Sequence, residues 1–221
     1  MPPSSLPRPA APSAAPAATA PTAPAIWLVR HGESTWNTLG LAQGHNDRAK
    51  LTTRGQRQAE EAAERFRGQQ VRAIYASDLR RARQTAAPFA RVLGLPVYAD
   101  TRLRERSLGV FEGTAAAAIG PEVTGLGDGR VLDPDARPAG GESVRDLYLR
   151  AAGFCEDLTS GELAIGEQTA GDLPPDAGDV VVVAHGGTVR VLEAYLNGIG
   201  VEEMAWGPVV NATVLRIAPA P

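Results

Sequence analysis

The chain has 221 residues, 43% of them hydrophobic, and a formal net charge of −3 at pH 7. This length and composition are typical of a globular protein with one domain and a sizeable core. The acidic balance argues against a nucleic acid or an anionic membrane surface as the main partner, because both attract basic proteins. The single cysteine, Cys155, excludes an intrachain disulfide bond and fits a reducing, cytoplasmic location.

Residues 1–25 differ from the rest of the chain, since they are almost entirely Ala, Pro, Ser and Thr. Such a segment buries too little apolar surface to offset the entropy of ordering it, so we predict a disordered tail. A signal peptide is the alternative, but proline interrupts the continuous apolar stretch that it needs. No stretch approaches the ~18 apolar residues of a membrane-spanning helix. The folded domain is expected at residues 26–218.

Predicted strands and helices alternate along the folded part. Four consecutive valines at residues 180–183 indicate a strand buried on both faces, as in a parallel sheet between layers of helices. This order of elements predicts an α/β fold, a three-layer α/β/α sandwich with a mostly parallel central sheet. The expected strands cover residues 26–30, 71–76, 95–98, 179–184 and 212–217, and the expected helices begin near residues 53, 79, 142 and 186.

Local signals define two of these helices and the connections around them. The spacing of Thr53 and Gln56 is that of a capping box, and Ser77 and Asp78 are good N-cap residues for the helix that follows. Pro88 should break or kink that helix after one or two turns. We expect a loop that crosses the site at residues 100–113, an irregular lid or insertion at 114–141 with at most a short helix near 115–119, and a polar connection at 159–178.

Basic side chains and histidines follow three of the predicted strands. Arg30 and His31 come after the first strand, residues 77–81 with Arg81 after the second, and His185 after the run of valines. The carboxyl ends of parallel strands share one edge of a sheet, so these groups should converge there. Arginine suits bidentate contacts with phosphate oxygens, and the helix after His185 adds free N–H groups. The sequence therefore predicts a phosphate site.

Such a site has the groups for phosphoryl transfer. A neutral imidazole can attack phosphorus and form a covalent intermediate, and cationic neighbours would hold it neutral. The leaving alkoxide then needs a proton from a carboxylic acid. Glu33, Glu105, Glu112 and Asp78 are candidates on spacing alone, and the chain has no Cys/His cluster with the spacing of metal ligands.

Residues 28–37, Leu-Val-Arg-His-Gly-Glu-Ser-Thr-Trp-Asn, resemble the signature of the histidine phosphatase superfamily, which includes cofactor-dependent phosphoglycerate mutase. The resemblance spans about residues 26–217 and continues, in order, through blocks at 43–55, 77–86, 103–113, 140–143 and 184–187. It implies a phosphoglycerate mutase-like fold and catalysis without a metal or other cofactor. It also implies a role for each matching position.

By this resemblance His31 is the nucleophile that becomes phosphohistidine, and Glu105 is the proton donor. His185 acts beside them on the phosphoryl group. The other implied contacts of the phosphoryl group are Arg30, Asn37, Arg81 and the backbone of Gly186, with Gln43 and Gly44 in a possible substrate loop.

Other conspicuous side chains have simpler interpretations. His45 is expected at the surface, Cys155 in the core, and Glu33 and Glu112 as partners that fix turns. The three arginines around Glu105, at positions 102, 104 and 106, are expected to be solvated. If one of them points inward, it would bind an acidic group of the substrate.

Three functions fit the sequence. A phosphatase of small phosphorylated metabolites is favoured over a phosphoglycerate mutase, because the segment over the site is short and basic only at Arg130 and Arg137. A loosely covered site admits water, which a mutase must exclude. An inactive phosphate-binding regulatory protein is the third, and it is disfavoured because every implied catalytic position is filled. A homodimer is plausible.

Overall fold

The computed structural model describes residues 24–165, 168–169 and 178–218, which fold around a five-stranded sheet in the order β3-β2-β8-β1-β9. Strand β9 is antiparallel to its neighbour β1, whereas the other pairs are parallel. The predicted mostly parallel sheet is confirmed. The strands are β1 (Ile26–Arg30), β2 (Val71–Ala76), β3 (Val97–Ala99), β8 (Asp179–Ala184) and β9 (Val214–Ile217).

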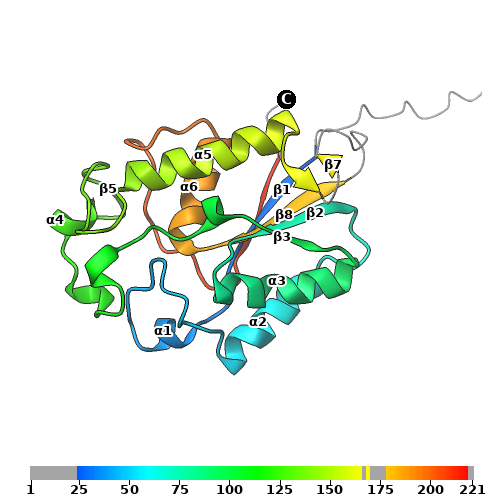
Figure 1. The fold of residues 1–221 in the computed structure, drawn as a ribbon, viewed down its shortest axis with the longest axis horizontal. Helices are drawn as coiled ribbons and strands as arrows, with labels where there is room; N and C mark the ends of the chain where they lie inside the picture. Colours follow the sequence, from blue (N-terminus) through cyan, green and yellow to red (C-terminus); the bar gives the residue numbers. More distant parts are fainter. Residues whose placement is uncertain (1–23, 166–167, 170–177, 219–221) are drawn as a thin grey trace, which may run out of the picture.

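Helices cover both faces of this sheet (Figure 1). Helices α2 (Thr53–Glu64) and α3 (Arg80–Leu93) lie on one face, and α5 (Val144–Ser160) and α6 (Gly186–Leu196) lie on the other. In β8, Val180 and Val182 pack into the core under α5 and α6, whereas the two valines that alternate with them pack into the core under α2 and α3. This alternation explains the run of valines and confirms the three-layer sandwich.

Two predicted helix starts are displaced by one residue. The N-cap of α2 is Thr52, whose hydroxyl accepts a hydrogen bond from the Gly55 N–H at 3.0 Å, so the predicted cap at Thr53 is wrong. Both threonines have the right chemistry, but the Thr52 N–H is tied to the Glu33 carbonyl at 2.9 Å. Helix α3 begins at Arg80 without a side-chain cap. The Ser77 hydroxyl instead contacts His185 across the sheet edge.

Pro88 does not break helix α3, which continues to Leu93 and ends at Gly94 in the left-handed conformation. Proline removes one backbone hydrogen bond inside a helix. Here the helix is held by its buried face, where Ala82, Ala86 and Phe89 are fully excluded from solvent. Packing against the sheet therefore overrides the local preference, and the expected break is wrong.

The connections contain more regular structure than expected. The short 3-10 helix η3 (Ala116–Ala118) lies where a short helix is predicted, and it is followed by α4 (Pro121–Thr124) and a hairpin of β4 (Leu126–Gly127) and β5 (Arg130–Val131). The hairpin turns at Asp128 and Gly129, and both residues have a positive φ. The Asp-Gly sequence is favoured in two-residue hairpin turns because such turns need this conformation. Other short elements are α1 (Thr35–Thr38), η1 (Thr101–Leu103), η2 (Gly109–Phe111), β6 (Ala164–Ile165) and β7 (Gln168–Thr169).

The packed domain includes Ala25, which the sequence assigns to the tail. Ala25 is buried, and its N–H donates to Asp179 Oδ1 at 2.8 Å. Residues 1–23 of the predicted tail lie outside the described residues, as do residues 166–167 and 170–177 of the predicted connection at 159–178. None of the described helices is long and apolar enough to cross a membrane.

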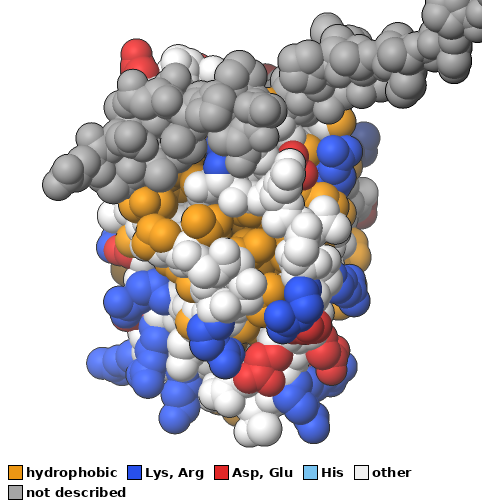
Figure 2. Space-filling view, turned by 90° about the vertical axis from the view of Figure 1, so that its right-hand side faces the viewer, with side chains coloured by type: hydrophobic (Ala, Val, Ile, Leu, Met, Phe, Trp, Pro, Cys, Tyr) orange, Lys and Arg blue, Asp and Glu red, His pale blue; other side chains and the backbone are white. Residues whose placement is uncertain are grey.

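The two ends of the sheet present different surfaces. At the end where β1 begins, apolar side chains gather in the middle of the face, with Lys and Arg side chains below them (Figure 2). Lys and Arg side chains gather at the lower left of that face, and Asp and Glu side chains lie among them at the lower right. The histidines and arginines of the predicted phosphate site lie instead at the carboxyl end of the strands.

The turn after His31 is held by a close approach between two backbones. A Cβ atom on Gly32 would lie 2.3 Å from the Gly55 carbonyl oxygen, and a Cβ atom on Gly55 would lie 2.0 Å from the Glu33 carbonyl oxygen. Real side chains do not fit at these distances. Only glycine at both positions lets the turn after β1 pack directly on the first turn of α2.

We predict that Gly55→Ala lowers the free energy of unfolding by roughly 1–3 kcal/mol, since the added methyl group overpacks a rigid backbone contact. Urea unfolding measures the change. The matched control is Gly153→Ala in α5, where no atom lies within 4 Å of the new methyl group. That change should stabilise the protein by roughly 0.5–1 kcal/mol. Equal stability of Gly55→Ala and the wild type would contradict this account of the turn.

Candidate active site

The carboxyl ends of three strands meet at one cavity of about 400 Å³. Strand β1 ends in Arg30 and leads to His31, β8 leads to His185, and the loop after β2 leads to Arg81 at the start of α3. The ring centroids of the two histidines are 5.2 Å apart. Seven of the nine predicted site residues line the cavity: Arg30, His31, Gln43, Gly44, Arg81, Glu105 and Gly186.

His31 is buried, and its Nδ1 atom lies 2.7 Å from the Gly32 carbonyl oxygen. A carbonyl oxygen only accepts, so Nδ1 carries the proton and Nε2 keeps its lone pair. Burial lowers the pKa of His31 well below its usual value, and the cations Arg81 and Arg30 lower it further. His31 is therefore neutral at neutral pH, with one nitrogen free to act as a nucleophile.

His185 lies behind His31 and is completely buried. Its Nε2 atom is 2.9 Å from the Ser77 hydroxyl, while its buried Nδ1 atom has no hydrogen-bond partner among the described residues. Burial lowers the pKa of this histidine well below its usual value, with further contributions from Arg81 and His31. When the Ser77 hydroxyl donates to Nε2, the single proton of the neutral imidazole is on Nδ1, which is then a free donor suited to contact an anion.

Two arginines are fixed beside the histidines. Arg81 is fully buried, and its terminal nitrogens donate to the backbone carbonyls of Gly44 at 2.8 Å and Asn46 at 3.0 Å. Arg30 donates to the Val209 carbonyl. The Nε atoms of both arginines are buried without a partner in the described part of the chain. Burial lowers the pKa of Arg81 to about 10, which leaves it charged at neutral pH.

Glu105 is the carboxylate that lines the cavity. Its Oε2 atom accepts a hydrogen bond from the Gly187 N–H at 3.0 Å, in the first turn of α6. The three alternative carboxylates are engaged elsewhere. The Glu33 carboxylate accepts from the Thr52 hydroxyl at 2.8 Å, Glu112 accepts from the His45 N–H at 2.8 Å, and Asp78 binds Arg104.

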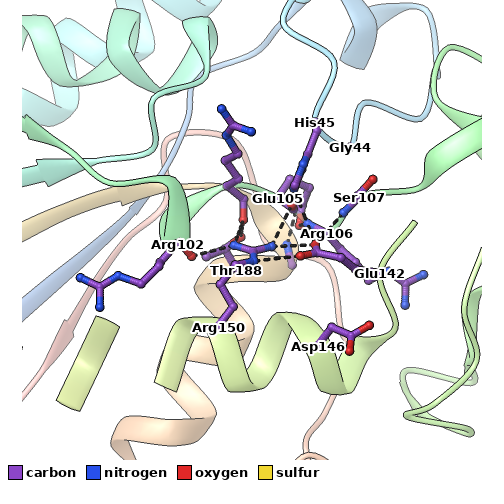
Figure 3. A network of polar contacts seen from close by, with 12 residues as sticks. Gly44, His45, Arg102, Glu105, Arg106, Ser107, Glu142, Asp146, Arg150 and Thr188 are labelled. Carbon is purple, nitrogen blue, oxygen red and sulfur yellow. Dashed lines mark hydrogen bonds and ion pairs between the residues drawn. The ribbon is translucent and has the colours of Figure 1, made fainter. Parts of the chain in front are cut away.

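Arg150 holds the loop that carries Glu105 (Figure 3). It lies on α5 and donates to the carbonyl oxygens of Arg102 at 2.7 Å, Arg104 at 3.0 Å and Glu105 at 3.2 Å. The remaining N–H groups bind the Glu142 carboxylate, which also accepts from the Ser107 N–H at 2.9 Å. All five N–H donors of Arg150 are used. The backbone on both sides of Glu105 is thereby fixed to α5.

Asn37 and His185 are the two predicted site residues that do not line the cavity. Asn37 forms a capping box with Ser34, whose N–H donates to Asn37 Oδ1 at 3.0 Å, and the same oxygen accepts from Asn211. Asn37 therefore secures the turn after His31. Gln43, which lines the cavity, accepts a hydrogen bond from the Ser34 hydroxyl at 2.9 Å.

The structure adds cavity residues that the sequence analysis does not assign. Arg106 is only 3% exposed, so the expectation that it is solvated is wrong, and it is the one of the three arginines around Glu105 that points inward and lines the cavity. Arg190 and Trp206 also line the cavity. Arg190 follows Gly186 by four residues, and this spacing on a helix is a signal that could have placed both on one face. Trp206 comes from the chain after α6 and has no such signal.

The expectations for the other conspicuous residues hold except for His45, which is half-buried and has its Nε2 atom inside the structure rather than at the surface. Glu33 and Glu112 bind neighbouring turns. Cys155 lies on the buried face of α5, where burial raises the pKa of its thiol to about 12. The His45 side chain is 30% exposed and lies 3.6 Å from Glu142. Within the described ranges, no group of three or more His, Cys, Asp or Glu side chains is arranged to hold a metal ion.

A sheet that brings neutral histidines, fixed arginines and a carboxylate to one cavity is suited to phosphoryl chemistry. The sequence model of the histidine phosphatase superfamily (branch 1) matches residues 26–221. The chain belongs to this superfamily, and the resemblance found in the sequence is confirmed.

Relatives in the superfamily include both phosphatases and mutases. The chain is 37% identical to glucosyl-3-phosphoglycerate phosphatase of Mycobacterium tuberculosis, over 86% of this chain and 83% of that protein. It is 38% identical to phosphoglycerate mutase-like protein 4 of Arabidopsis thaliana, over 76% and 68% of the two chains. The mycobacterial glucosyl-3-phosphoglycerate phosphatase solved with VO3 superposes with a TM-score of 0.72 at 33% identity, over 88% of this chain and 92% of that one.

The two buried histidines make the stability of the protein depend on pH. Folding lowers the pKa of both His31 and His185 below ~6.5, so the unfolded chain binds protons that the folded protein does not. The free energy of unfolding should therefore fall as the pH drops through ~6.5, with a slope that approaches ~1.4 kcal/mol per pH unit for each histidine.

Urea unfolding between about pH 7.5 and about pH 5.5 in phosphate-free buffer measures this slope. His185→Asn should reduce it by roughly half, because one of the two groups is removed. Folding lowers the pKa of Asp78 and Glu142, so their contributions are lost only at lower pH. A stability that does not change over this interval would contradict the neutral state of the pair.

Proposed function

We propose that the protein is a phosphomonoester hydrolase that acts on a small phosphorylated metabolite through a phosphohistidine intermediate on His31, without a metal ion. One observation carries the proposal. The free Nε2 atom of a neutral His31 belongs to the same cavity as two fixed arginines and one carboxylate. The phosphatase relatives described above support the hydrolase class.

In the first step the Nε2 lone pair of His31 attacks phosphorus, and the bond between phosphorus and the ester oxygen breaks. Arg30, Arg81 and the Nδ1 side of His185 hold the phosphoryl oxygens, so their charges stabilise the transferring group. Glu105 enters this step as the carboxylic acid and gives its proton to the leaving alkoxide. The products of the step are the free alcohol, phosphohistidine and the Glu105 carboxylate.

In the second step water attacks phosphorus on phosphohistidine. The Glu105 carboxylate takes a proton from this water, and the bond between His31 and phosphorus breaks. Inorganic phosphate leaves, and both side chains return to their starting protonation states. Arg150 contributes to both steps by fixing the backbone from which Glu105 reaches the cavity.

The walls of the cavity favour hydrolysis over a mutase reaction. Residues 114–141 contribute Ala116, Ile119, Thr124 and Leu126 to the lining, whereas their basic residues Arg130 and Arg137 do not line it. Arg137 is exposed and paired with Asp146. A mutase must hold its phosphorylated intermediate away from water, and these small and apolar groups supply no cation for that. The relative named phosphoglycerate mutase-like protein 4 keeps phosphoglycerate mutase as the alternative.

The proposal also covers the domain bounds, the location and the partners of the protein. Residues 26–218 form the catalytic domain together with the buried Ala25, residues 114–141 are a partial lid that selects the substrate, and the residues before Ala25 are a disordered tail. The protein works in the cytoplasm, with a small phosphorylated metabolite rather than a nucleic acid or a membrane as its partner, and a homodimer is compatible with it. An inactive phosphate-binding protein is disfavoured, since every proposed catalytic position is filled.

His31→Ala should reduce hydrolysis of p-nitrophenyl phosphate by at least ~10³-fold, because no other nucleophile replaces the imidazole. The wild type should keep its activity in EDTA and release one inorganic phosphate for each p-nitrophenol. His45→Ala is the matched control and should keep most of the activity, since its side chain is partly exposed and outside the cavity. Retained activity in His31→Ala, or its loss in EDTA, would refute the proposed mechanism.

The loss of kcat/KM in Glu105→Gln should depend on the leaving group of the phosphate ester. An alkyl ester such as glycerol 2-phosphate needs a proton on its leaving oxygen, so its kcat/KM should fall by ~10²–10⁴-fold. The loss for p-nitrophenyl phosphate should be much smaller, because p-nitrophenolate leaves without a proton. Glu112→Gln is the control, and it should affect both esters alike because Glu112 only fixes the loop. Equal losses in Glu105→Gln would remove its acid role.

A further inference from the structure

Ser77 is a buried serine beside the site that the proposed mechanism does not use. It follows β2, and His185 follows the neighbouring strand β8. The Ser77 N–H donates to the Val183 carbonyl at 3.0 Å, which ties the serine to the end of β8. Its hydroxyl oxygen lies 2.9 Å from Nε2 of His185. Both residues are completely excluded from solvent, so their polar atoms need partners inside the protein.

The partners of the Ser77 hydroxyl determine the direction of this hydrogen bond. The oxygen accepts from the Leu79 N–H at 3.3 Å, and an N–H group cannot take up the hydroxyl proton. Among the described residues, Nε2 of His185 is the one acceptor that the hydroxyl has. A buried hydroxyl that donates to nothing costs free energy. The Ser77 hydroxyl therefore donates, and Nε2 accepts.

This direction places the proton of His185 on its other nitrogen. Burial, and then the charge of Arg81, lower the pKa of His185 well below its usual value, so the ring is neutral and has a single proton. Since Nε2 accepts, that proton is on Nδ1, which has no partner in the described part of the chain. His185 is also the N-cap residue of α6, yet its side chain accepts no hydrogen bond from that helix. A protonated Nδ1 cannot accept one.

The opposite tautomer would leave two buried groups in poor positions. With the proton on Nε2, the Ser77 hydroxyl proton would have no acceptor among the described residues. Nδ1 would then present a lone pair beside His31, where an anion needs a donor. The two histidines of the site therefore have different partners and different tasks. The Gly32 carbonyl leaves His31 with a free lone pair, whereas Ser77 leaves His185 with a free N–H group.

We propose that Ser77 is a positioning residue, which holds His185 in the tautomer with the proton on Nδ1 and so makes it a neutral N–H donor to the phosphoryl oxygens. This inference rests on the proposed function, because that function places the phosphoryl group beside His185. Ser77 itself contacts neither the substrate nor the attacking nitrogen. It acts through the ring of His185, which keeps its proton through both steps of the reaction.

Nitrogen-15 NMR spectra of the histidine rings test the tautomer without any turnover. Protonated and unprotonated ring nitrogens have well-separated chemical shifts. The chain has only three histidines, so the His185 signals are identified by their loss in His185→Asn. At neutral pH the wild type should show a protonated Nδ1 and an unprotonated Nε2 in His185. Ser77→Ala should move part of the population to the tautomer with the proton on Nε2.

Two further variants separate this role from a loss of packing. Ser77→Thr keeps the hydroxyl group and should restore the tautomer of the wild type. Ser143→Ala is the matched control, because it also removes a buried hydroxyl, the N-cap of α5, from a residue that does not contact either histidine of the site. It should leave the signals of His185 unchanged.

Calorimetric titration with inorganic phosphate tests what the donor does. Ser77→Ala should bind phosphate ~10-fold more weakly than the wild type, the range expected for the loss of a hydrogen bond to an anion. Ser77→Thr and Ser143→Ala should bind it as the wild type does.

A proton on Nε2 of His185 in the wild type would overturn the proposal, and this spectrum needs no variant. An unchanged tautomer in Ser77→Ala, or a changed tautomer without weaker phosphate binding, would overturn it as well. A wild type that has the expected tautomer but binds no phosphate would instead refute the proposed phosphoryl site. The failure of the positioning role and the failure of the proposed function are therefore distinguishable.

Discussion

The site depends on burying the Arg81 cation beside two neutral histidines. Burying a guanidinium away from any carboxylate of the described residues costs free energy. The backbone carbonyls of Gly44 and Asn46 offset that cost by accepting its hydrogen bonds. Burial lowers the pKa of both His31 and His185, and the charge of Arg81 lowers it further. One ordered loop therefore keeps the cation in place beside two unprotonated imidazoles.

The groups around this cation are tied to one another by hydrogen bonds to the backbone, and the ion pair between Arg150 and Glu142 supports them. Thr85, one turn after Arg81, donates to the Arg81 carbonyl and accepts from the Gly32 N–H next to His31. Arg150 holds the opposite side by binding carbonyls on both sides of Glu105, the proposed proton donor. A network of this kind keeps its geometry when the charges inside the cavity change, which a two-step phosphoryl transfer requires.

How much of this the sequence predicts depends on where each residue lies. Strand ends in a parallel sheet converge, so Arg30, His31, Arg81 and His185 are predictable from topology alone. Local sequence signals predict helix ends less well where tertiary contacts override them, as at Thr52 and Pro88. Arg106 is beyond sequence reasoning for a different reason. Three arginines surround Glu105, and only the folded loop decides which of them turns toward the cavity.

The two sides of the cavity are built by different kinds of structural element. The phosphoryl half is built from strand ends and helix starts of the central sheet, which cannot move without disturbing the core. The other half is lined by residues 106–126 and 206–209, which lie in short elements and loops. Substitutions in these loops leave His31, Arg30 and Arg81 in place, because those residues follow from the packing of the central sheet. Under the proposed function, the loops therefore adjust the leaving-group side while the sheet keeps the phosphoryl side constant.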